Sequence, residues 1–310
     1  MKDKKVVFMG SPEFSLPVLE YLIENTNVIG VVTQPDKEVG RKRILTPPPV
    51  KVMAFEHNIK VLQPVKLKTD YKCIIDLEPD VIVTCAYGQI LPFELLNYPK
   101  YKTINVHASL LPKYRGGAPI HHAILNGEHE TGITIMRTDK GMDSGDIIGK
   151  EVLKINDNDT YDTVNKSLSY LGAKSLAKYL PKVFDGTASY EKQDDSLVTY
   201  AYVIKREDEK LNFNDNTINI YNKIRGLSSI PSAYAILDNE EVKIYNSKIG
   251  NSKPSTPGKI TNIYKDGIGV STLDGEIIIT DLKVFGKKRM LAKDYLNGVD
   301  KEKLLHKSFE

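Results

Sequence analysis

The chain has 310 residues, and its 43 Lys and Arg against 40 Asp and Glu give a formal net charge of +3. Hydrophobic residues make up 41% and charged residues 27%, which is ordinary for globular proteins and excludes a fibrous or disordered chain. The length suggests two domains. A charge this close to balance does not by itself indicate a nucleic-acid partner.

The apolar run at residues 5–9 is closed by Pro12, so it is too short for a secretion signal. No apolar stretch has the length of a membrane span. Cys73 and Cys85 stand in apolar surroundings without a metal-like spacing, and we expect buried, reduced thiols. We therefore expect a cytoplasmic protein without membrane contact.

The first part of the chain alternates between strand and helix patterns. The loop at 34–49 between the second strand and the next helix is long and basic. Such alternation predicts an α/β domain with a doubly wound, mostly parallel sheet. Strands are expected at 5–9, 28–33, 60–62, 80–86, 103–107, 131–136 and 146–153, and helices at 15–24, 50–57 and 160–184.

The pattern changes after Gly186. A mixed polar stretch is followed by a helix at 217–225, five short β runs between 233 and 284, and a last helix at 290–296. Short β runs at this spacing are typical of a small antiparallel barrel or Greek-key sheet. We therefore expect a first domain at 1–188, a linker at 189–206 and a C-terminal β domain at 207–310.

The most informative stretch is TINVHASLLPKYRGGAPI, residues 103–120. Asn105 and His107 are two apart on a predicted strand, so both side chains leave the same face. A turn and a pair of glycines follow at once. Open α/β sheets place their active sites at the carboxyl ends of strands, just before such a loop.

A second polar loop, DKGMDSGD at 139–146, contains Asp143. An amide, an imidazole and a carboxylate suit acyl transfer, because Asn105 and His107 can face a developing oxyanion while Asp143 orients the imidazole. A single histidine on an apolar strand is more often structural. Here the shared face and the two glycine-rich loops favour catalysis.

Two other chemistries are disfavoured. The turn Gly10-Ser11-Pro12 follows the first strand, but G-x-G-x-x-G is absent and the second strand does not end in an acidic residue, which argues against a nicotinamide or flavin. His121, His122 and His129 fit helix surface or packing, and with no Cys/His set we predict no metal site.

Basic residues cluster in three places. Arg41, Lys42 and Arg43 lie in the long loop, and long loops in compact domains tend to be functional or disordered. Two further runs in the C-terminal part have no acidic residue between their members. Each cluster fits either a solvated face or a surface that follows phosphates. The two runs are Lys243, Lys248, Lys253, Lys259 and Lys265, and then Lys283, Lys287, Lys288, Arg289 and Lys293.

Together these motifs resemble the folate-dependent formyltransferases over essentially the whole chain. The matching segments are NVHASLLP at 105–112, RG at 115–116, API at 118–120, MDSGD at 142–146, MGSPEF at 9–14, QPD at 34–36, AYG at 86–88, ILP at 90–92 and LVTYA at 197–201. Where that family often carries Trp-Pro, this chain has Ile230-Pro231 and contains no Trp.

The resemblance implies an enzyme of translation initiation that acts on initiator methionyl-tRNA, with 10-formyltetrahydrofolate as co-substrate and no metal. Asn105, His107 and Asp143 match the catalytic positions. The resemblance also implies an OB-like C-terminal barrel that helps to hold tRNA, and we expect a monomer. Ser109, Leu110, Leu111 and Pro112 match the folate segment, and Arg41, Lys42 and Arg43 fall in the tRNA-facing loop.

Other functions remain open at this point. A formyltransferase for glycinamide ribonucleotide would usually end near the first domain, whereas one for a nucleotide-linked amino sugar could carry an extra domain. The basic loop and the lysine runs favour tRNA over both. A non-catalytic RNA-binding module is a rival of another class, and the intact set of Asn105, His107 and Asp143 argues against it.

Overall fold

The computed structural model describes residues 1–40 and 42–310. The chain forms two compact units. The first consists of Met1–Pro119, Glu130–Lys154 and Asn165–Ala201, and the second of Ile120–His129, Ile155–Val164 and Tyr202–Glu310. Each unit thus contains segments that are distant in sequence. The domain boundaries expected at 188 and 206 stay a prediction.

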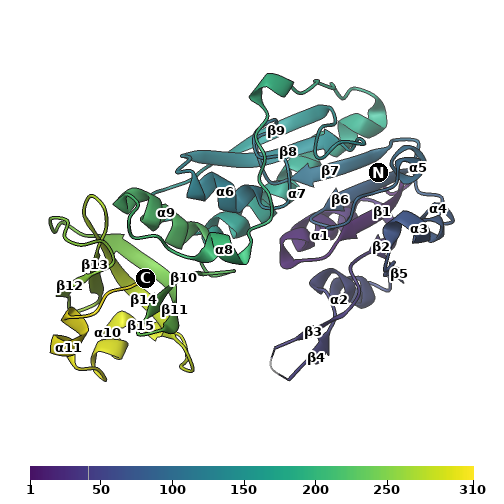
Figure 1. Ribbon diagram of the computed structural model, residues 1–310. Coiled ribbons are helices and arrows are strands. Elements are labelled where there is room, and N and C mark those ends of the chain that lie inside the picture. Colours follow the sequence, from purple (N-terminus) through teal and green to yellow (C-terminus); the bar gives the residue numbers. More distant parts are fainter. Residues whose placement is uncertain (41) are drawn as a thin grey trace. The chain divides into compact units, whose positions relative to one another are not determined.

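The first unit is built on a sheet with the strand order β5-β2-β1-β6-β7-β8-β9 (Figure 1). Pairing is parallel from β5 to β7, and β8 and β9 are antiparallel. This confirms the expected doubly wound, mostly parallel sheet. The chain winds outward in opposite directions from β1 and β6, which places a topological switch point there. The strands are β1 (Lys5–Gly10), β2 (Asn27–Val32), β5 (Val61–Leu62), β6 (Val81–Cys85), β7 (Thr103–His107), β8 (Glu130–Arg137) and β9 (Ile147–Lys154).

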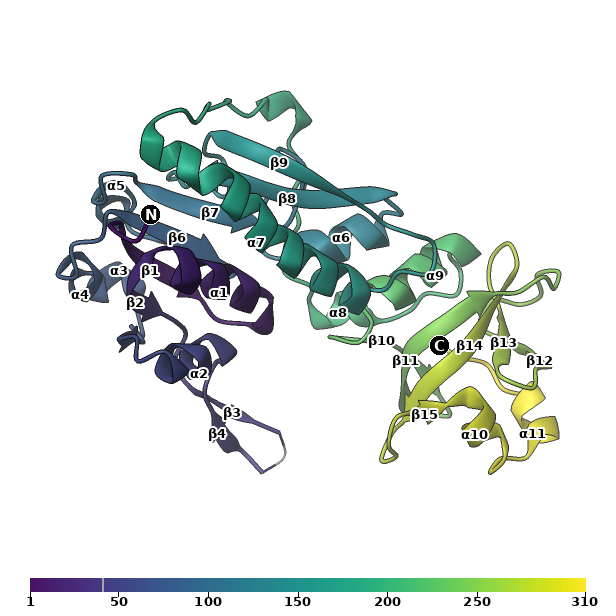
Figure 2. The same ribbon diagram turned by 180° about the vertical axis from the view of Figure 1, so that it is seen from behind.

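Helices pack on this sheet, whose inner strands β1 and β6 are buried along nearly their whole length. Helices α1 (Leu16–Asn25) and α7 (Tyr161–Asp185) lie side by side across it (Figure 2). Gly172 allows this approach, since a Cβ there would lie 3.1 Å from Val106 Cγ1 and 3.5 Å from Val18 Cγ2. A second apolar cluster joins β1, β2 and β6 to α3 (Leu67–Asp70), α4 (Lys72–Ile75) and α5 (Phe93–Asn97).

The stretch predicted as a long loop contains a hairpin instead. Strands β3 (Lys37–Val39) and β4 (Ile44–Thr46) pair antiparallel. In the sequence this hairpin follows the short 3-10 helix η1 (Glu13–Ser15), α1 and β2, and it precedes α2 (Pro49–Glu56). Every described residue of the hairpin is exposed. Its strands therefore carry no buried-face pattern, which is why the sequence did not reveal them. Figure 1 shows the hairpin standing away from the sheet.

The second unit contains an antiparallel sheet with the order β10-β11-β14-β13-β12, and β15 pairs with β14. This confirms the antiparallel β domain. The expected helix at 290–296 begins as β15 and becomes α10, and α11 was not predicted. The elements are α6 (Pro119–Leu125), α8 (Arg206–Glu209), α9 (Thr217–Gly226), β10 (Ala233–Leu237), β11 (Glu240–Ile249), β12 (Ile260–Ile263), β13 (Ile268–Ser271), β14 (Glu276–Val284), β15 (Met290–Leu291), α10 (Ala292–Leu296) and α11 (Lys301–Leu305).

Histidines of α6 take the packing role that the sequence predicted. The ring of His121 stacks on Tyr161 with 3.9 Å between centroids, and its Nε2 lies 3.1 Å from the Ile230 carbonyl oxygen. Burial lowers the pKa of His121. His122 Nε2 lies 2.9 Å from the Tyr202 carbonyl oxygen. Both histidines thereby fix α6 within the second unit.

The two cysteines differ in burial. Cys85, at the end of β6, is fully buried, and burial raises the pKa of its thiol to about 12. Cys73 is only partly buried, and its pKa is raised as well. Both thiols are free. Within the described residues, no helix combines the length and the apolar character needed to cross a membrane.

Candidate active site

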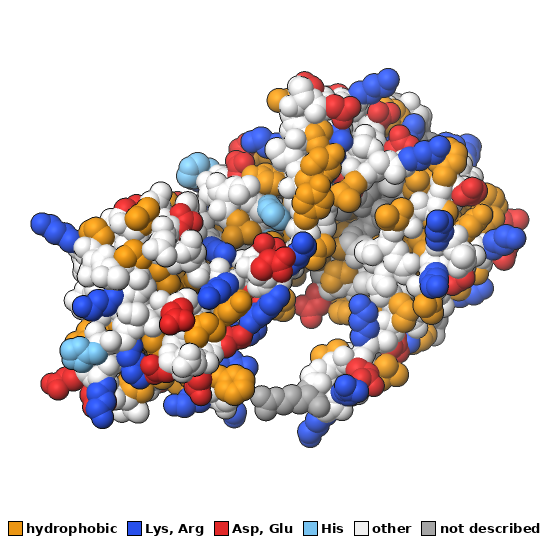
Figure 3. Space-filling view, viewed as in Figure 1, with side chains coloured by type: hydrophobic (Ala, Val, Ile, Leu, Met, Phe, Trp, Pro, Cys, Tyr) orange, Lys and Arg blue, Asp and Glu red, His pale blue; other side chains and the backbone are white. Residues whose placement is uncertain are grey.

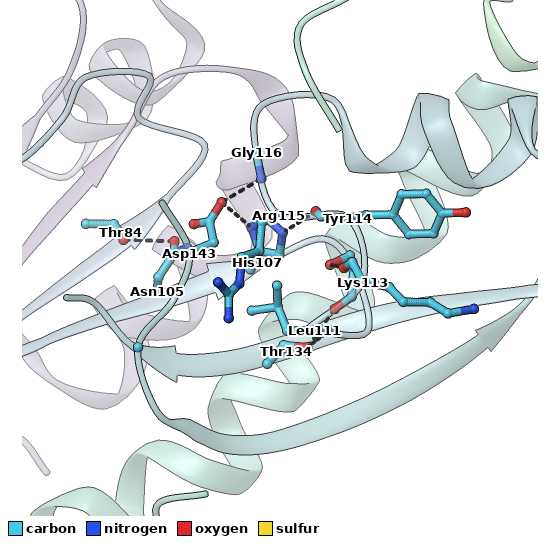
Figure 4. Close-up of polar contacts among 12 residues, drawn as sticks. Thr84, Asn105, His107, Leu111, Lys113, Tyr114, Arg115, Gly116, Thr134 and Asp143 are labelled. Carbon is cyan, nitrogen blue, oxygen red and sulfur yellow. Dashed lines mark hydrogen bonds and ion pairs between the residues drawn. The ribbon is translucent and has the colours of Figure 1, made fainter. Parts of the chain in front are cut away.

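Asn105 lies on β7 with its amide orientation fixed by a neighbour. The Thr84 hydroxyl on β6 donates to Oδ1 of Asn105 at 2.9 Å, and the two residues are cross-strand partners (Figure 4). In this arrangement the hydroxyl is the donor and the amide oxygen is the atom that faces it. The NH₂ group of Asn105 therefore points away from Thr84 and can donate to a ligand.

His107 ends the same strand, and its side chain is only 7% exposed. Its Nε2 lies 3.1 Å from the Tyr114 carbonyl oxygen. A carbonyl can only accept, so this nitrogen carries a proton. Its other ring nitrogen, Nδ1, lies 3.7 Å from Oδ2 of Asp143. The two ring nitrogens thus face protein groups on opposite sides.

Asp143 reaches the ring from the second polar loop. The backbone N–H of Gly116 donates to Asp143 Oδ2 at 2.8 Å. The Asp143 side chain remains 20% exposed, and its backbone has φ of 46°, a left-handed conformation that costs on the order of 1 kcal/mol or more in residues other than Gly. The structure therefore brings together Asn105, His107 and Asp143, the three residues predicted to be catalytic.

Thr134 closes the turn that follows β7. Its hydroxyl donates to the Ser109 carbonyl at 2.6 Å and accepts from the Leu111 N–H at 3.1 Å. The Ser109 hydroxyl donates to the Lys113 carbonyl at 2.7 Å. Side chains of Ser109 and Leu111 are fully buried, whereas Leu110 and Pro112 are partly exposed. Of the predicted folate segment, Leu110 and Pro112 are the residues whose side chains can meet a ligand.

The basic residues predicted to bind tRNA lie on other elements of the chain than the catalytic set. Lys42 and Arg43 sit at the exposed tip of the β3–β4 hairpin, where Arg43 pairs with Glu38 at 3.7 Å, while Arg41 lies outside the described residues. In the second unit, Lys248 pairs with Asp266 and Arg289 with Asp281. Acidic residues that flank the runs in the sequence thus neutralise part of both, and Figure 3 shows Lys and Arg mixed with Asp and Glu on the visible face.

Sequence reasoning missed Thr84 and Thr134. Threonine is a common strand residue, so neither stands out until the strand register shows Thr84 opposite Asn105 and Thr134 opposite His107. Over the ranges 1–40 and 42–310, no group of three or more His, Cys, Asp or Glu is placed to hold a metal ion.

Two family models match successive parts of the chain. The formyl transferase model matches residues 4–180, and the formyl transferase C-terminal domain model matches residues 203–300. A methionyl-tRNA formyltransferase of Staphylococcus aureus strain MW2 is 49% identical over 298 residues, which is 95% of this chain and 96% of that relative. The chain belongs to the formyl transferase family.

Solved structures with low identity share the fold. An N-formyltransferase of Helicobacter canadensis, in complex with folinic acid and dTDP-3-aminofucose, gives a TM-score of 0.67 at 24% identity over 89% of this chain and 98% of that one. A methionyl-tRNA formyltransferase of Clostridium thermocellum gives 0.59 at 16% identity over 91% and 99%. At such identities the likeness concerns the fold alone.

Gly145 offers a test of how closely the Asp143 loop must be placed. A Cβ at Gly145 would lie 1.9 Å from the Arg137 carbonyl oxygen, which is backbone and cannot move aside alone. We expect Gly145→Ala to displace the loop and to lower the turnover for formyl transfer by roughly 10²-fold, the cost of about 1 Å of misplacement. Steady-state kinetics of the purified variant measure this.

Gly141→Ala is the matched control in the same loop. A Cβ there would meet the Ser144 hydroxyl at 2.4 Å, and a side-chain rotation relieves that contact. We expect this variant to stay close to the parent enzyme. Equal losses in both variants would show that the loop tolerates no added methyl group at all, and that the Arg137 contact is not the reason.

Proposed function

We propose that this chain transfers a formyl group from 10-formyltetrahydrofolate to the α-amino group of methionine on initiator methionyl-tRNA. The observation that carries the proposal is the 49% identity to methionyl-tRNA formyltransferases across 95% of the chain. The formyl transferase model, which matches residues 4–180, spans Asn105, His107 and Asp143. The bound folinic acid of the Helicobacter canadensis enzyme supports a folate donor. We also propose that the protein is cytoplasmic, that it is a monomer and that it needs no metal.

A neutral amine is required at the start of the reaction. Its nitrogen attacks the formyl carbon, a C–N bond forms, and the carbonyl oxygen becomes an oxyanion. The bond from carbon to the folate N10 then breaks. One proton leaves the attacking nitrogen and one proton reaches N10, so the protons balance without any other reactant. The site must therefore stabilise an oxyanion and move one proton.

Asn105 is the oxyanion donor in this proposal. Thr84 binds the amide oxygen, so the NH₂ group already points away from Thr84 before substrate arrives. A donor fixed in advance does not need to reorient during the reaction, and this is the basis of oxyanion stabilisation.

His107 and Asp143 act as a pair. A proton on Nδ1 of His107 makes the 3.7 Å contact with Asp143 an ion pair and brings positive charge near the oxyanion. The ring can donate to the oxyanion itself only after Nε2 leaves the Tyr114 carbonyl. Asp143 accepts through Oδ2 from Gly116, which leaves Oδ1 to relay the amine proton to N10, directly or through water.

The β3–β4 hairpin suits a macromolecular acceptor. Its exposed side chains include the apolar Val39, Ile44 and Leu45, at 55%, 61% and 64% exposure, next to Lys42 and Arg43. A small acceptor such as a nucleotide sugar needs no such arm. Apolar and basic side chains together can contact both the bases and the phosphates of an RNA end.

The choice of acceptor tests the proposal as a whole. We expect formylation of initiator methionyl-tRNA and none of unacylated tRNA, glycinamide ribonucleotide or a nucleotide-linked amino sugar. The measurement is transfer of labelled formyl from 10-formyltetrahydrofolate to each acceptor. Preference for the amino sugar would reject the tRNA assignment while leaving the family unchanged.

Substitutions in the catalytic set should lower turnover without removing the folate. Loss of one oxyanion donor costs on the order of 10²–10³ in turnover, and we expect losses of that size for Asn105→Ala and His107→Ala. Asp143→Asn keeps the shape but removes the charge and should also be severely impaired. Folate titration and circular dichroism control for binding and folding. Near-normal turnover of any variant removes that residue from the mechanism.

The basic residues 41–43, of which the structure describes Lys42 and Arg43, should act on tRNA alone. Replacing Arg41, Lys42 and Arg43 with Ala should raise the KM for methionyl-tRNA and flatten its salt dependence, because fewer counterions are released on binding. The KM for folate should not change. The matched control replaces the exposed Lys66, Lys68 and Lys72 of the same unit, which removes the same charge. Identical salt slopes in the two triple variants would show that the tip makes no specific contact.

A further inference from the structure

The stretch expected to be a linker lies along the candidate active site. We name residues 191–201 the strap. At its start, Glu191 exchanges two backbone hydrogen bonds with Ile147 at the beginning of β9, at 2.8 and 2.9 Å. Near its end, the Thr199 carbonyl accepts from the Arg115 N–H and the Ala201 N–H donates to the Arg115 carbonyl, at 2.9 and 2.8 Å. The strap is therefore fixed at both ends within the first unit.

Between these two anchors, the Gln193 side chain is held by three hydrogen bonds. Its Nε2 donates to the carbonyls of Asp143 and Gly145, at 2.7 and 2.8 Å. Its Oε1 accepts from Arg115 Nε at 3.0 Å. Both amide hydrogens and the amide oxygen are thus used. Gln193 is only half-buried, among mostly exposed neighbours.

These three bonds link the two sides of the candidate site. Asp143 and Gly145 belong to the loop that carries the carboxylate. Arg115 directly precedes Gly116, whose N–H binds that carboxylate. Gln193 therefore holds the backbone at Asp143 and the residue next to its hydrogen-bond donor at the same time. The left-handed backbone of Asp143, with φ of 46°, is a conformation that surrounding contacts must maintain.

We propose that Gln193 is a positioning residue for formyl transfer, which acts by holding Asp143 in place against His107 and Gly116. The proposal rests on the function proposed above for Asp143. It assigns the strap a part in the chemistry, whereas a simple linker would affect only stability. Gln193 itself touches no reacting atom.

Gln193→Ala and Gln193→Glu distinguish the two hydrogen bonds that Gln193 donates from the one that it accepts. The glutamate variant can still accept from Arg115 but cannot donate to the two carbonyls. We expect both variants to lose at least about tenfold in kcat, since small displacements of catalytic groups are costly. The KM values for folate and for methionyl-tRNA, and the melting temperature, should stay close to those of the parent.

Asp195→Ala is the matched control. Asp195 lies on the same strap and binds the other side of the same guanidinium, with Oδ1 3.1 Å from Arg115 Nη2, but its side chain is 88% exposed. The Asp195 carboxylate is solvent-exposed, so water can replace it at Nη2 of Arg115, and we expect kcat near that of the parent. A loss in Asp195→Ala equal to that in Gln193→Ala would place the effect on Arg115 and overturn the role assigned to the two carbonyls.

A double-mutant cycle decides whether Gln193 acts through Asp143. In an Asp143→Asn background, Gln193→Ala should cause little further loss, because residues that act as a unit are strongly non-additive. Single-turnover kinetics with enzyme in excess measure the slow variants. The same factor in both backgrounds, or a Gln193→Ala enzyme with normal kcat, overturns the proposal.

The two proposals fail in distinguishable ways. If the parent enzyme does not formylate methionyl-tRNA, the proposed function is wrong, and the same variant-to-parent ratios are then measured with the nucleotide-linked amino sugar. A normal ratio for Gln193→Ala with whichever acceptor the parent uses rejects the role of Gln193 alone.

Discussion

The candidate site depends on one oxygen atom, Oδ2 of Asp143. It accepts the N–H of Gly116 and faces Nδ1 of His107, so it ties the loop after β7 to the loop after β8. A carboxylate can connect the two loops in this way because it accepts several hydrogen bonds at once. Glycine is needed on both sides. A Cβ at Gly116 would lie 2.6 Å from the Ala201 carbonyl oxygen, and one at Gly145 would lie 1.9 Å from that of Arg137.

Strand β7 owes its arrangement to the strands beside it. Thr84 on β6 stands in register with Asn105, and Thr134 on β8 stands in register with His107. The first threonine orients the amide, and the second holds the backbone of the following turn. Groups placed on a sheet and supported by neighbouring hydrogen bonds keep their geometry better than groups on free loops.

Sequence patterns reveal those parts of this fold that bury one face. The two-residue spacing of Asn105 and His107, at the end of an apolar run, placed both on a strand next to a loop, and the sheet of the first unit followed from alternating strands and helices. The hairpin escaped prediction because its residues are exposed on both faces. The role of the strap was missed for a related reason, since backbone and amide hydrogen bonds hold it and these leave no hydrophobic period. The order of the chain also concealed that Ile120–His129 and Ile155–Val164 belong with the second unit.

Arg115 shows how Gln193 of the strap is fixed against the site. Its side chain is 6% exposed, and a buried cation is costly unless its hydrogens are bound. Nε donates to Gln193 while Nη2 donates to Asp195, two acceptors on one strap that a planar guanidinium can bind together. A lysine has a single charged nitrogen on a flexible stem and cannot hold both in a fixed geometry. The guanidinium thus fixes Gln193, the amide of Gln193 in turn holds the carbonyls of Asp143 and Gly145, and the polar strap becomes part of the support for the carboxylate.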